Sequence, residues 1–343
     1  MRYVSIKRLT EFGTRLLVSR GVPVKNARCA SESAVLNEAA GVNTHGITQF
    51  FYFDANVGSS IDPKAEPYVV SEKAAVALID GNRSLAQLAV DLASGIAGKK
   101  ARKYGVATVC VRNISWVAGI GVKLIPLVEK GFFAEFWAGS CFKYVAPFGG
   151  MEARLGTNPI GFGFPVPGHH PVIVDISTSA VARGKIPFLV KSEIKTPEKI
   201  FLDSRGKPTD DPSKLGKKGT LMPVGGEHYG YKGFGLSLWV EALALMSGNL
   251  YKPERVTGES FTLTVIDPAA FGETESYEKE VKTFVKLIKQ SKKRPGAKEI
   301  RLPGERTFMA LEKSRKKGVL LSGETVAKLD KIAFKNSLKP LGK

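Results

Sequence analysis

The sequence has no run of about 18 uncharged apolar residues that would span a membrane. Its first residues, MRYVSIKRLTEF, reach charged side chains too early for the apolar segment of a signal peptide. Cysteine is scarce as well: Cys29, Cys110 and Cys141 are far apart and in no metal-binding spacing. These absences favour a cytoplasmic protein with free thiols, no membrane association and no metal site.

Acidic residues are too few to balance the basic ones. The chain has 51 lysines and arginines against 32 aspartates and glutamates, a net charge of +19. Such an excess can neutralise nucleic-acid phosphates, but here it is spread along the chain without a recognisable nucleic-acid-binding module. We therefore do not expect nucleic acid as a partner, and the charge is better suited to attracting anionic cofactors and substrates.

The glycine fingerprint of the usual dinucleotide-binding fold is also missing. No G-x-G-x-x-G follows a predicted first strand, and the nearest approach, GIGVK at residues 119–123, lacks the third glycine. If a dinucleotide binds to this protein, a scaffold other than the Rossmann fold must hold it.

The composition is that of an ordinary globular protein, with 43% hydrophobic and 24% charged residues. A length of 343 residues suits two or three subdomains that share contacts. We expect a helical N-terminal subdomain over residues 1–70 and a central α/β region over 71–255 that binds cofactor and substrate. A C-terminal α/β segment over 256–343 is expected to pack back on the rest.

Hydrophobic periodicity supports an α/β fold. Residues 4–41 have helical apolar spacing, with a break at Gly21 and Pro23, and place Leu9, Phe12, Leu16 and Leu17 on one stripe. Later, short β-branched runs alternate with helical patterns. The predicted strands lie within 74–81, 106–113, 132–140, 171–177 (buried) and 261–267. The predicted helices cover 84–104, a segment ending at 131, 233–247 and 276–293, then one or two closing helices. A polar, turn-rich segment is expected at 187–232.

Seven phrases, in order along nearly the whole chain, resemble the type-2 malate/L-lactate dehydrogenases, a family that also includes sulfolactate, ureidoglycolate and cyclic-imine reductases. The phrases are THGI (44–47), APFGG (146–150), LGTNP (155–159), DISTSAVARGK (175–185), GKPTDDP (206–212), GG…YKGFGL (225–236) and LPGER (302–306). The resemblance implies a non-Rossmann malate/L-lactate (sulfolactate) dehydrogenase-like α/β fold, a homodimer, and NAD or NADP bound between subdomains. It also implies reduction of a C=O or C=N group beside a carboxylate, or the reverse oxidation.

His45 is the first catalytic candidate. Hydride transfer to a carbonyl leaves negative charge on oxygen, so a proton donor that titrates near neutrality is needed. The resemblance assigns proton donation to the position of His45 and relay to the preceding hydroxyl, here Thr44. The structural alternative is a histidine hydrogen-bonded at a helix C-terminus.

Two residues depart from the family pattern at expected substrate positions. Gln49 stands where an arginine usually holds the substrate carboxylate, and a charge-assisted pair contributes about 1.5–3 kcal/mol, more than a neutral amide. Trp116 stands where dehydrogenase members have a catalytic histidine, and an indole stacks on rings but does not exchange protons usefully. Both departures suggest a substrate other than simple malate or lactate.

The remaining site candidates are cationic side chains and residues of the family phrases. Three cations could supply the positive charge that is absent at position 49: Lys185, a third catalytic candidate, and the substrate-binding candidates Lys143 and Arg183. The alternative for each is a side chain that faces solvent or a phosphate. Thr157 is expected to face the substrate. The resemblance assigns cofactor contacts to Trp116, Val117, Gly119, Asp175, Ile176, Ser177, Lys232, Gly233 and Arg306. The segment after Gly248 is shorter than the usual substrate-side loop of the family.

The sequence therefore supports three hypotheses. The first is an NAD(P)H-dependent oxidoreductase that interconverts a 2-oxo or imine compound and its 2-hydroxy or amine form, with altered substrate preference. The second is a catalytically impaired member of the same fold that binds cofactor or a partner. The third, a nucleic-acid-binding protein, rests on charge alone.

Overall fold

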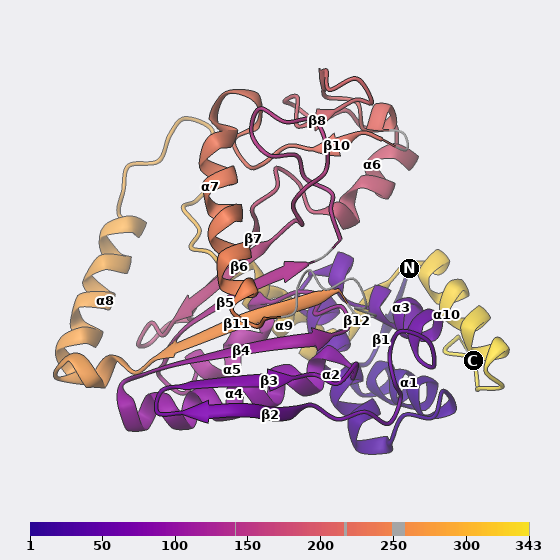
Figure 1. The fold of residues 1–343 in the computed structure, drawn as a ribbon, viewed down its shortest axis with the longest axis horizontal. Coiled ribbons are helices and arrows are strands. Elements are labelled where there is room, and N and C mark those ends of the chain that lie inside the picture. Colours follow the sequence, from indigo (N-terminus) through magenta and orange to yellow (C-terminus); the bar gives the residue numbers. More distant parts are fainter. Residues whose placement is uncertain (141, 216–217, 249–257, 343) are drawn as a thin grey trace.

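A seven-stranded mixed sheet forms the centre of the computed structural model, which describes residues 1–140, 142–215, 218–248 and 258–342 (Figure 1). The strand order is β2-β3-β4-β11-β5-β6-β7. The strands are β2 (Tyr68–Lys73), β3 (Val76–Asp80), β4 (Val106–Ile114), β5 (Phe133–Ser140), β6 (Pro159–Phe164), β7 (Val172–Ser177) and β11 (Glu259–Ile266). Among the described strands of this sheet, only β3 and β4 pair in parallel, so the expected non-Rossmann α/β class is confirmed.

Helices cover both faces of this sheet. Alternate side chains of a strand point to opposite faces, and the neighbours Phe136 and Trp137 in β5 illustrate this. Phe136 stacks on Phe261 within the main core, whereas Trp137 packs with Val240. The helices on the main-core side are α4 (Ala86–Tyr104) and α5 (Gly121–Val128), and α7 (Gly226–Leu245) lies on the other side (Figure 1).

The N-terminal helices form as predicted. They are α1 (Ile6–Ser19), α2 (Val24–Ala39) and α3 (Thr48–Asn56), with the 3₁₀ turn η1 (Asn43–His45) between the last two. The Ser5 side chain caps α1 by accepting a hydrogen bond from the Arg8 N–H. The predicted stripe of Leu9, Phe12, Leu16 and Leu17 is fully buried.

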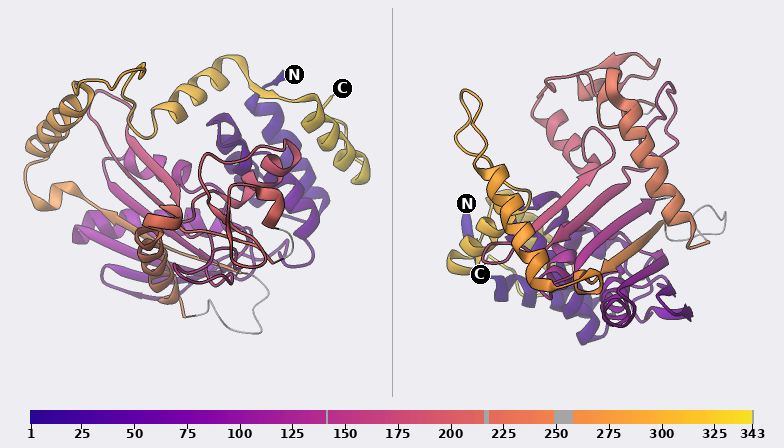
Figure 2. Two further views of the ribbon diagram at one scale, coloured as in Figure 1. Left: turned by 90° about the horizontal axis from the view of Figure 1, so that it is seen from above. Right: turned by 90° about the vertical axis from the view of Figure 1, so that its left-hand side faces the viewer.

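A small lobe stands above one end of the sheet, beside α7 (Figure 2). It contains η2 (Arg183–Lys185), α6 (Ile186–Lys191), η3 (Pro212–Leu215) and the three-stranded sheet of β8 (Phe201–Leu202), β9 (Pro208–Thr209) and β10 (Thr220–Leu221). Its buried core consists of Val145, Leu155, Phe201 and Leu221. The turn-rich segment 187–232 is thus organised around its own apolar cluster.

The C-terminal segment returns to the rest of the molecule. β11 lies between β4 and β5, and β12 (Val319–Leu321) pairs antiparallel with β1 (Arg2–Val4), which brings both termini to one side (Figure 2). The remaining elements are η4 (Pro268–Phe271), α8 (Thr274–Lys289), α9 (Glu305–Lys317) and α10 (Gly323–Lys335). Within the described residues, no helix is long and apolar enough to cross a membrane. The proposed subdomain limits stay predictions, and the one at 255 lies outside the described residues.

Two sequence predictions need correction. Helix α7 begins at Gly226, not near Gly233, because the chain turns into the helix at Gly225 through a left-handed conformation with φ of 99°. The strand at 171–177 is not buried throughout: β7 is the last strand of the sheet, and Asp175 and Ile176 are exposed.

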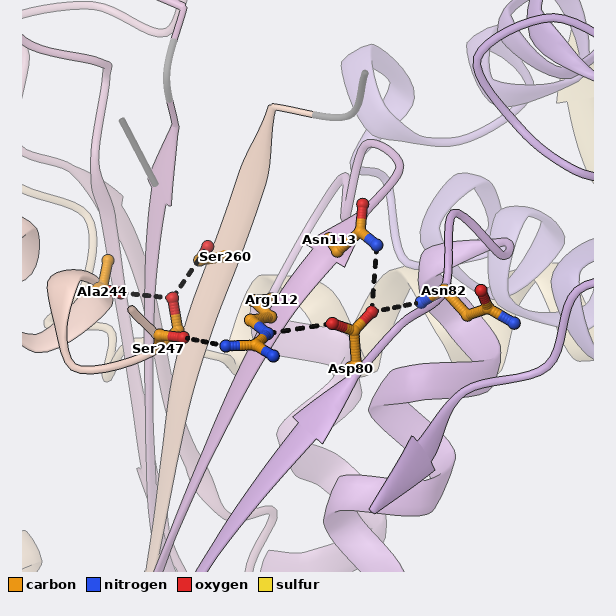
Figure 3. A network of polar contacts seen from close by, with 7 residues as sticks. All are labelled: Asp80, Asn82, Arg112, Asn113, Ala244, Ser247 and Ser260. Carbon is orange, nitrogen blue, oxygen red and sulfur yellow. Dashed lines mark hydrogen bonds and ion pairs between the residues drawn. The ribbon is translucent and has the colours of Figure 1, made fainter. Parts of the chain in front are cut away.

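An ion pair between the partly buried Arg112 and the buried Asp80 connects the sheet to the end of α7 (Figure 3). The Arg112 guanidinium donates from Nε to Asp80 at 2.9 Å and from Nη1 to the carbonyl of Ser247 at 3.1 Å. Asp80 also accepts hydrogen bonds from Asn113 Nδ2 and the Asn82 N–H. Burial opposes ionisation of Asp80, but these partners outweigh it and hold its pKa below the usual value.

We predict that Arg112→Met lowers the free energy of unfolding by about 3 kcal/mol, because it leaves the Asp80 carboxylate without its cation. Urea unfolding measures the change. The matched control is Arg28→Met, which removes an exposed pair with Glu32 in helix α2 and should leave the free energy of unfolding nearly unchanged. Equal losses in the two variants would contradict this role of Arg112.

Candidate active site

The segment that carries His45 is held tightly against helix α2. Glu38 of α2 accepts hydrogen bonds from the Ile47 N–H at 2.8 Å and from Asn43 Nδ2 at 2.7 Å, on either side of His45. Gly46 lies so close to α2 that a Cβ there would overlap the Glu38 carboxylate and approach Glu38 Cα to 2.8 Å. The glycine of the THGI phrase therefore lets η1 pack on α2, which fixes the position of His45.

The His45 ring lies between a hydroxyl and an indole. Its Nδ1 is 2.7 Å from Thr44 Oγ1, so the predicted contact between these two side chains is present. Its other side meets Trp116, with ring centroids 5.5 Å apart. Burial first, and the positive charge of Lys123 second, lower the pKa of His45 to about 4. Without a ligand, His45 is therefore neutral at pH 7 and suited to accept a proton.

Tyr52 supports Trp116 from the other direction. The Tyr52 hydroxyl accepts a hydrogen bond from the backbone N–H of Trp116 at 3.2 Å, and the two rings meet edge to face with their centroids 5.5 Å apart. Burial raises the pKa of Tyr52 to about 12. Trp116 is therefore part of an aromatic wall beside His45, with its ring tilted against the imidazole and edge to face with Tyr52; a stacking role for the indole stays a prediction.

Gln49 of α3 hydrogen-bonds to the backbone of His45 and not to its imidazole ring. The side chain is fully buried; its Nε2 donates to the His45 carbonyl at 2.5 Å, and its Oε1 accepts from Gln87 Nε2 at 2.8 Å. Both ends of the amide are therefore occupied within the protein. In this arrangement Gln49 orients the backbone of His45.

The loop that follows β4 approaches α2 and β7 closely. A Cβ at Gly119 would overlap Asn37 Oδ1 and lie 3.4 Å from His45 Cβ, and one at Gly121 would lie 2.8 Å from Asp175 Cβ. Asp175 Oδ2 accepts hydrogen bonds from the N–H groups of Ile120 (3.1 Å) and Gly121 (2.8 Å), at the start of α5. These contacts bring β7 and α5 together near His45.

Val117 is held by β11. The Val117 N–H donates to Glu259 Oε2 at 2.8 Å, and the Val117 side chain is buried in the main core. Val117 therefore fixes the path of the loop between Trp116 and Gly119.

The cationic candidates occupy different surroundings. Arg183 is exposed and lies over the Tyr144 ring at 3.9 Å, with Nη1 donating to the Tyr144 hydroxyl at 2.7 Å. Lys185 is exposed in the same turn, η2, which contacts Thr44 through Gly184. Lys143 instead pairs with Glu241 of α7 at 3.1 Å. Only η2 therefore brings predicted cations next to the Thr44–His45 turn.

The predicted cofactor phrases contact the two ends of β7. The Thr178 N–H donates to the Thr157 carbonyl at 3.0 Å, and the Val224 N–H to the Thr178 carbonyl at 2.8 Å. The Ile173 N–H donates to the Pro303 carbonyl at 3.1 Å. Backbone contacts thus bring LGTNP, DIST and the turn before α7 together at the C-terminal end of β7, and LPGER to its N-terminal end.

Within this group, the side chains differ in what they offer a ligand. Lys232 and Arg306 are exposed and form no ion pair with any residue that the structure describes. Ser177 Oγ donates to the Ser179 carbonyl at 2.9 Å, and the Ile176 side chain is exposed. Gly233 is buried, and a Cβ added there would lie 2.6 Å from the backbone nitrogen of Val224, so packing alone explains the glycine. The two cations remain the strongest phosphate candidates.

Three residues near His45 were missed by sequence reasoning: Asn37, Tyr52 and Lys123. The first and last lie inside helical patterns, where a single polar residue carries no functional signal. Tyr52 lies in an aromatic run of α3, in which one tyrosine does not stand out as functional. The short segment expected after Gly248 lies outside the described residues, as does Cys141, while Cys29 and Cys110 are free cysteines. The site roles themselves stay predictions.

We predict that Gly119→Ala lowers the free energy of unfolding by about 1–3 kcal/mol, because the new methyl group overlaps Asn37 Oδ1. Adding Asn37→Ala should recover at least about 0.5 kcal/mol of that loss, since it removes the overlapping atom. Urea unfolding of the two single variants and the double variant measures this coupling. Strictly additive losses would contradict the proposed contact.

Comparison with known proteins identifies the family. Residues 4–330 match the family model described as malate/L-lactate dehydrogenase. The chain is 29% identical over 352 residues to a malate dehydrogenase of Pyrococcus abyssi (99% of this chain, 97% of the relative). It is 31% identical to a Δ1-pyrroline-2-carboxylate reductase of Ancylobacter novellus (94% of each).

Solved structures give the same result. The sulfolactate dehydrogenase of Methanocaldococcus jannaschii superposes with a TM-score of 0.88 and 29% identity, covering 98% of both chains. The expected oxidoreductase class, with NAD or NADP as cofactor, is confirmed at the level of the family. The chain belongs to the malate/L-lactate dehydrogenase family.

Proposed function

We propose that this protein interconverts a 2-oxo acid or cyclic imine with its 2-hydroxy acid or amine, using NAD or NADP, and that its substrate preference differs from that of simple malate or lactate enzymes. The observation that carries the proposal is the Thr44–His45–Trp116 arrangement, in which a neutral imidazole is held by a hydroxyl and bordered by an indole. The Trp116 ring narrows the space beside His45, which supports the altered preference.

The residues around β7 fit a dinucleotide. Lys232 and Arg306 are exposed cations without a carboxylate partner among the described residues, the chemistry that phosphate oxygens require. Backbone contacts bring both their segments to β7. We assign the phosphate groups to these two residues, and the bound nicotinamide ring supplies or accepts the hydride.

His45 transfers the proton in this proposal. In oxidation, the neutral ring takes the proton of the substrate hydroxyl. In reduction, negative charge develops on the substrate oxygen and raises the pKa of the neighbouring imidazole, because an opposite charge stabilises its protonated form. Thr44 keeps the ring oriented through Nδ1, so that Nε2 is the nitrogen that meets the substrate.

The test is turnover of a panel containing malate, lactate, sulfolactate and Δ1-pyrroline-2-carboxylate with NAD(H) and NADP(H). We predict that His45→Gln lowers kcat/KM at least about 100-fold while the coenzyme dissociation constant changes little. The control His169→Gln changes an exposed histidine of the β6–β7 turn and should leave kcat/KM unchanged.

The second candidate, a catalytically impaired member, is favoured by one observation: the Gln49 amide is hydrogen-bonded within the protein at both ends and offers no charge to a substrate. Tight coenzyme binding without turnover of any panel substrate would support that candidate. Turnover that survives His45→Gln would contradict the assigned role of His45.

We also propose a homodimer formed through α7. Leu238 and Leu245, and likewise Trp239 and Met246, are seven residues apart and therefore share one side of the helix end, where all four are 46–55% exposed. We predict that Leu238→Glu shifts the dimer towards monomer in light scattering after gel filtration. Phe334→Glu, at an apolar position of α10 that is 65% exposed, is the control. A monomeric wild-type protein would contradict the proposal.

A further inference from the structure

Lys123 is a lysine of helix α5 whose ammonium group points toward α2. Its Nζ donates to Ser33 Oγ at 3.0 Å. Ser33 and Asn37 are four residues apart in α2 and therefore on one face of that helix. Asn37 in turn contacts Gly119, which borders His45. On this face of α2, the Lys123 contact at Ser33 therefore lies about one helical turn from Asn37, which contacts Gly119 beside His45.

The Lys123 ammonium has no counter-ion within ion-pair distance in the part of the chain that the structure describes. Among the described residues it forms no ion pair, although Asp91 of α4, Cys29 of α2 and Asp175 of β7 act on it from a greater distance. Burial lowers the pKa of Lys123 to about 8, so the group is mostly charged at pH 7. A largely desolvated charge without a counter-ion is costly, and lysines in such positions commonly meet an anionic ligand.

Asn37 adds a second unpaired group to the same place. The residue is fully buried, and its Oδ1 has no hydrogen-bond partner among the described residues, while Nδ2 donates to the Ser33 carbonyl. Unsatisfied buried polar atoms are rare in proteins and concentrate at sites of function or strain. The region between α2, His45 and the start of α5 therefore holds both an unpaired cation and an unpaired acceptor.

We propose that Lys123 binds the carboxylate of the substrate beside His45. This assignment rests on the proposed function, since it takes His45 as the residue that meets the reacting group. A carboxylate fits better than a pyrophosphate, because Asp91 and Asp175 would repel a ligand of higher negative charge. The exposed Lys232 and Arg306 are better placed for phosphate.

Binding of a carboxylate at Lys123 also changes His45. The Lys123 charge disfavours the protonated imidazole. A carboxylate that pairs with Lys123 offsets this charge, so the pKa of His45 rises on substrate binding. The substrate itself thereby moves His45 toward the state that donates a proton during reduction.

The test uses oxamate, a small stable analogue of a 2-oxo acid, titrated calorimetrically into the full-length protein with saturating NADH or NADPH at pH 7. We expect Lys123→Met to weaken oxamate binding about 10-fold to 100-fold, and Lys123→Arg to retain most of the affinity. Lys130→Met, at an exposed lysine just after α5, changes the net charge equally and should have no effect. Inorganic phosphate and pyrophosphate are titrated in parallel.

Histidine NMR provides a readout that a purely structural lysine would not affect. The chain has only four histidines, so the His45 signal is identified by its loss in His45→Gln. Oxamate should raise the pKa of His45 in the wild-type protein by about one unit, and should not do so in Lys123→Met. If Lys123→Met does not fold, the Lys123 Cε signal in the wild-type protein replaces it, because its titration near pH 8 should move upward with oxamate.

The outcomes separate the two proposals. Unchanged oxamate affinity in Lys123→Met, no oxamate binding to the wild-type protein, or a preference of Lys123 for pyrophosphate would overturn the role of Lys123. Loss of turnover on every panel substrate, with oxamate binding still dependent on Lys123, would instead overturn the proposed function alone.

Discussion

The close packing of two glycine-containing segments on helix α2 is the constraint on which the candidate site depends. Gly46 lets the turn with His45 approach Glu38, and Gly119 lets the loop after β4 approach Asn37. Glu38 then binds the backbone and side chain on both sides of His45. Because a methyl group at either glycine would overlap α2, the positions of His45, Trp116 and Lys123 follow from the same helix face.

The charges of His45 and Lys123 depend on the same arrangement. Burial and Lys123 keep His45 neutral, and the protein offers Lys123 no counter-ion among the described residues. Gln49, by contrast, is neutral and already hydrogen-bonded on both ends. The positive charge that a carboxylate substrate needs is therefore supplied from α5, while the residue four positions after the histidine orients the backbone.

Much of the fold could be predicted from local patterns. The stripe of α1, the helix α4 and the strands β4 and β11 follow from apolar spacing, and the family phrases pointed to Thr44 and His45. Other features depend on contacts between distant residues. The insertion of β11 between β4 and β5, the exposure of the edge strand β7 and the inward side chain of Gln49 are decided by sheet order and packing. The role proposed for Lys123 could not be predicted for the same reason, because a single lysine in an apolar helix indicates no function until its neighbours in space are known.

A crystal structure of the protein with NADH or NADPH and oxamate bound would show directly whether substrate lies between His45 and Lys123. We expect the oxamate carboxylate within ion-pair distance of Lys123 Nζ and its carbonyl oxygen hydrogen-bonded to His45 Nε2. Oxamate held instead by Arg183 or Lys185, with His45 and Lys123 both out of contact, would contradict this expectation.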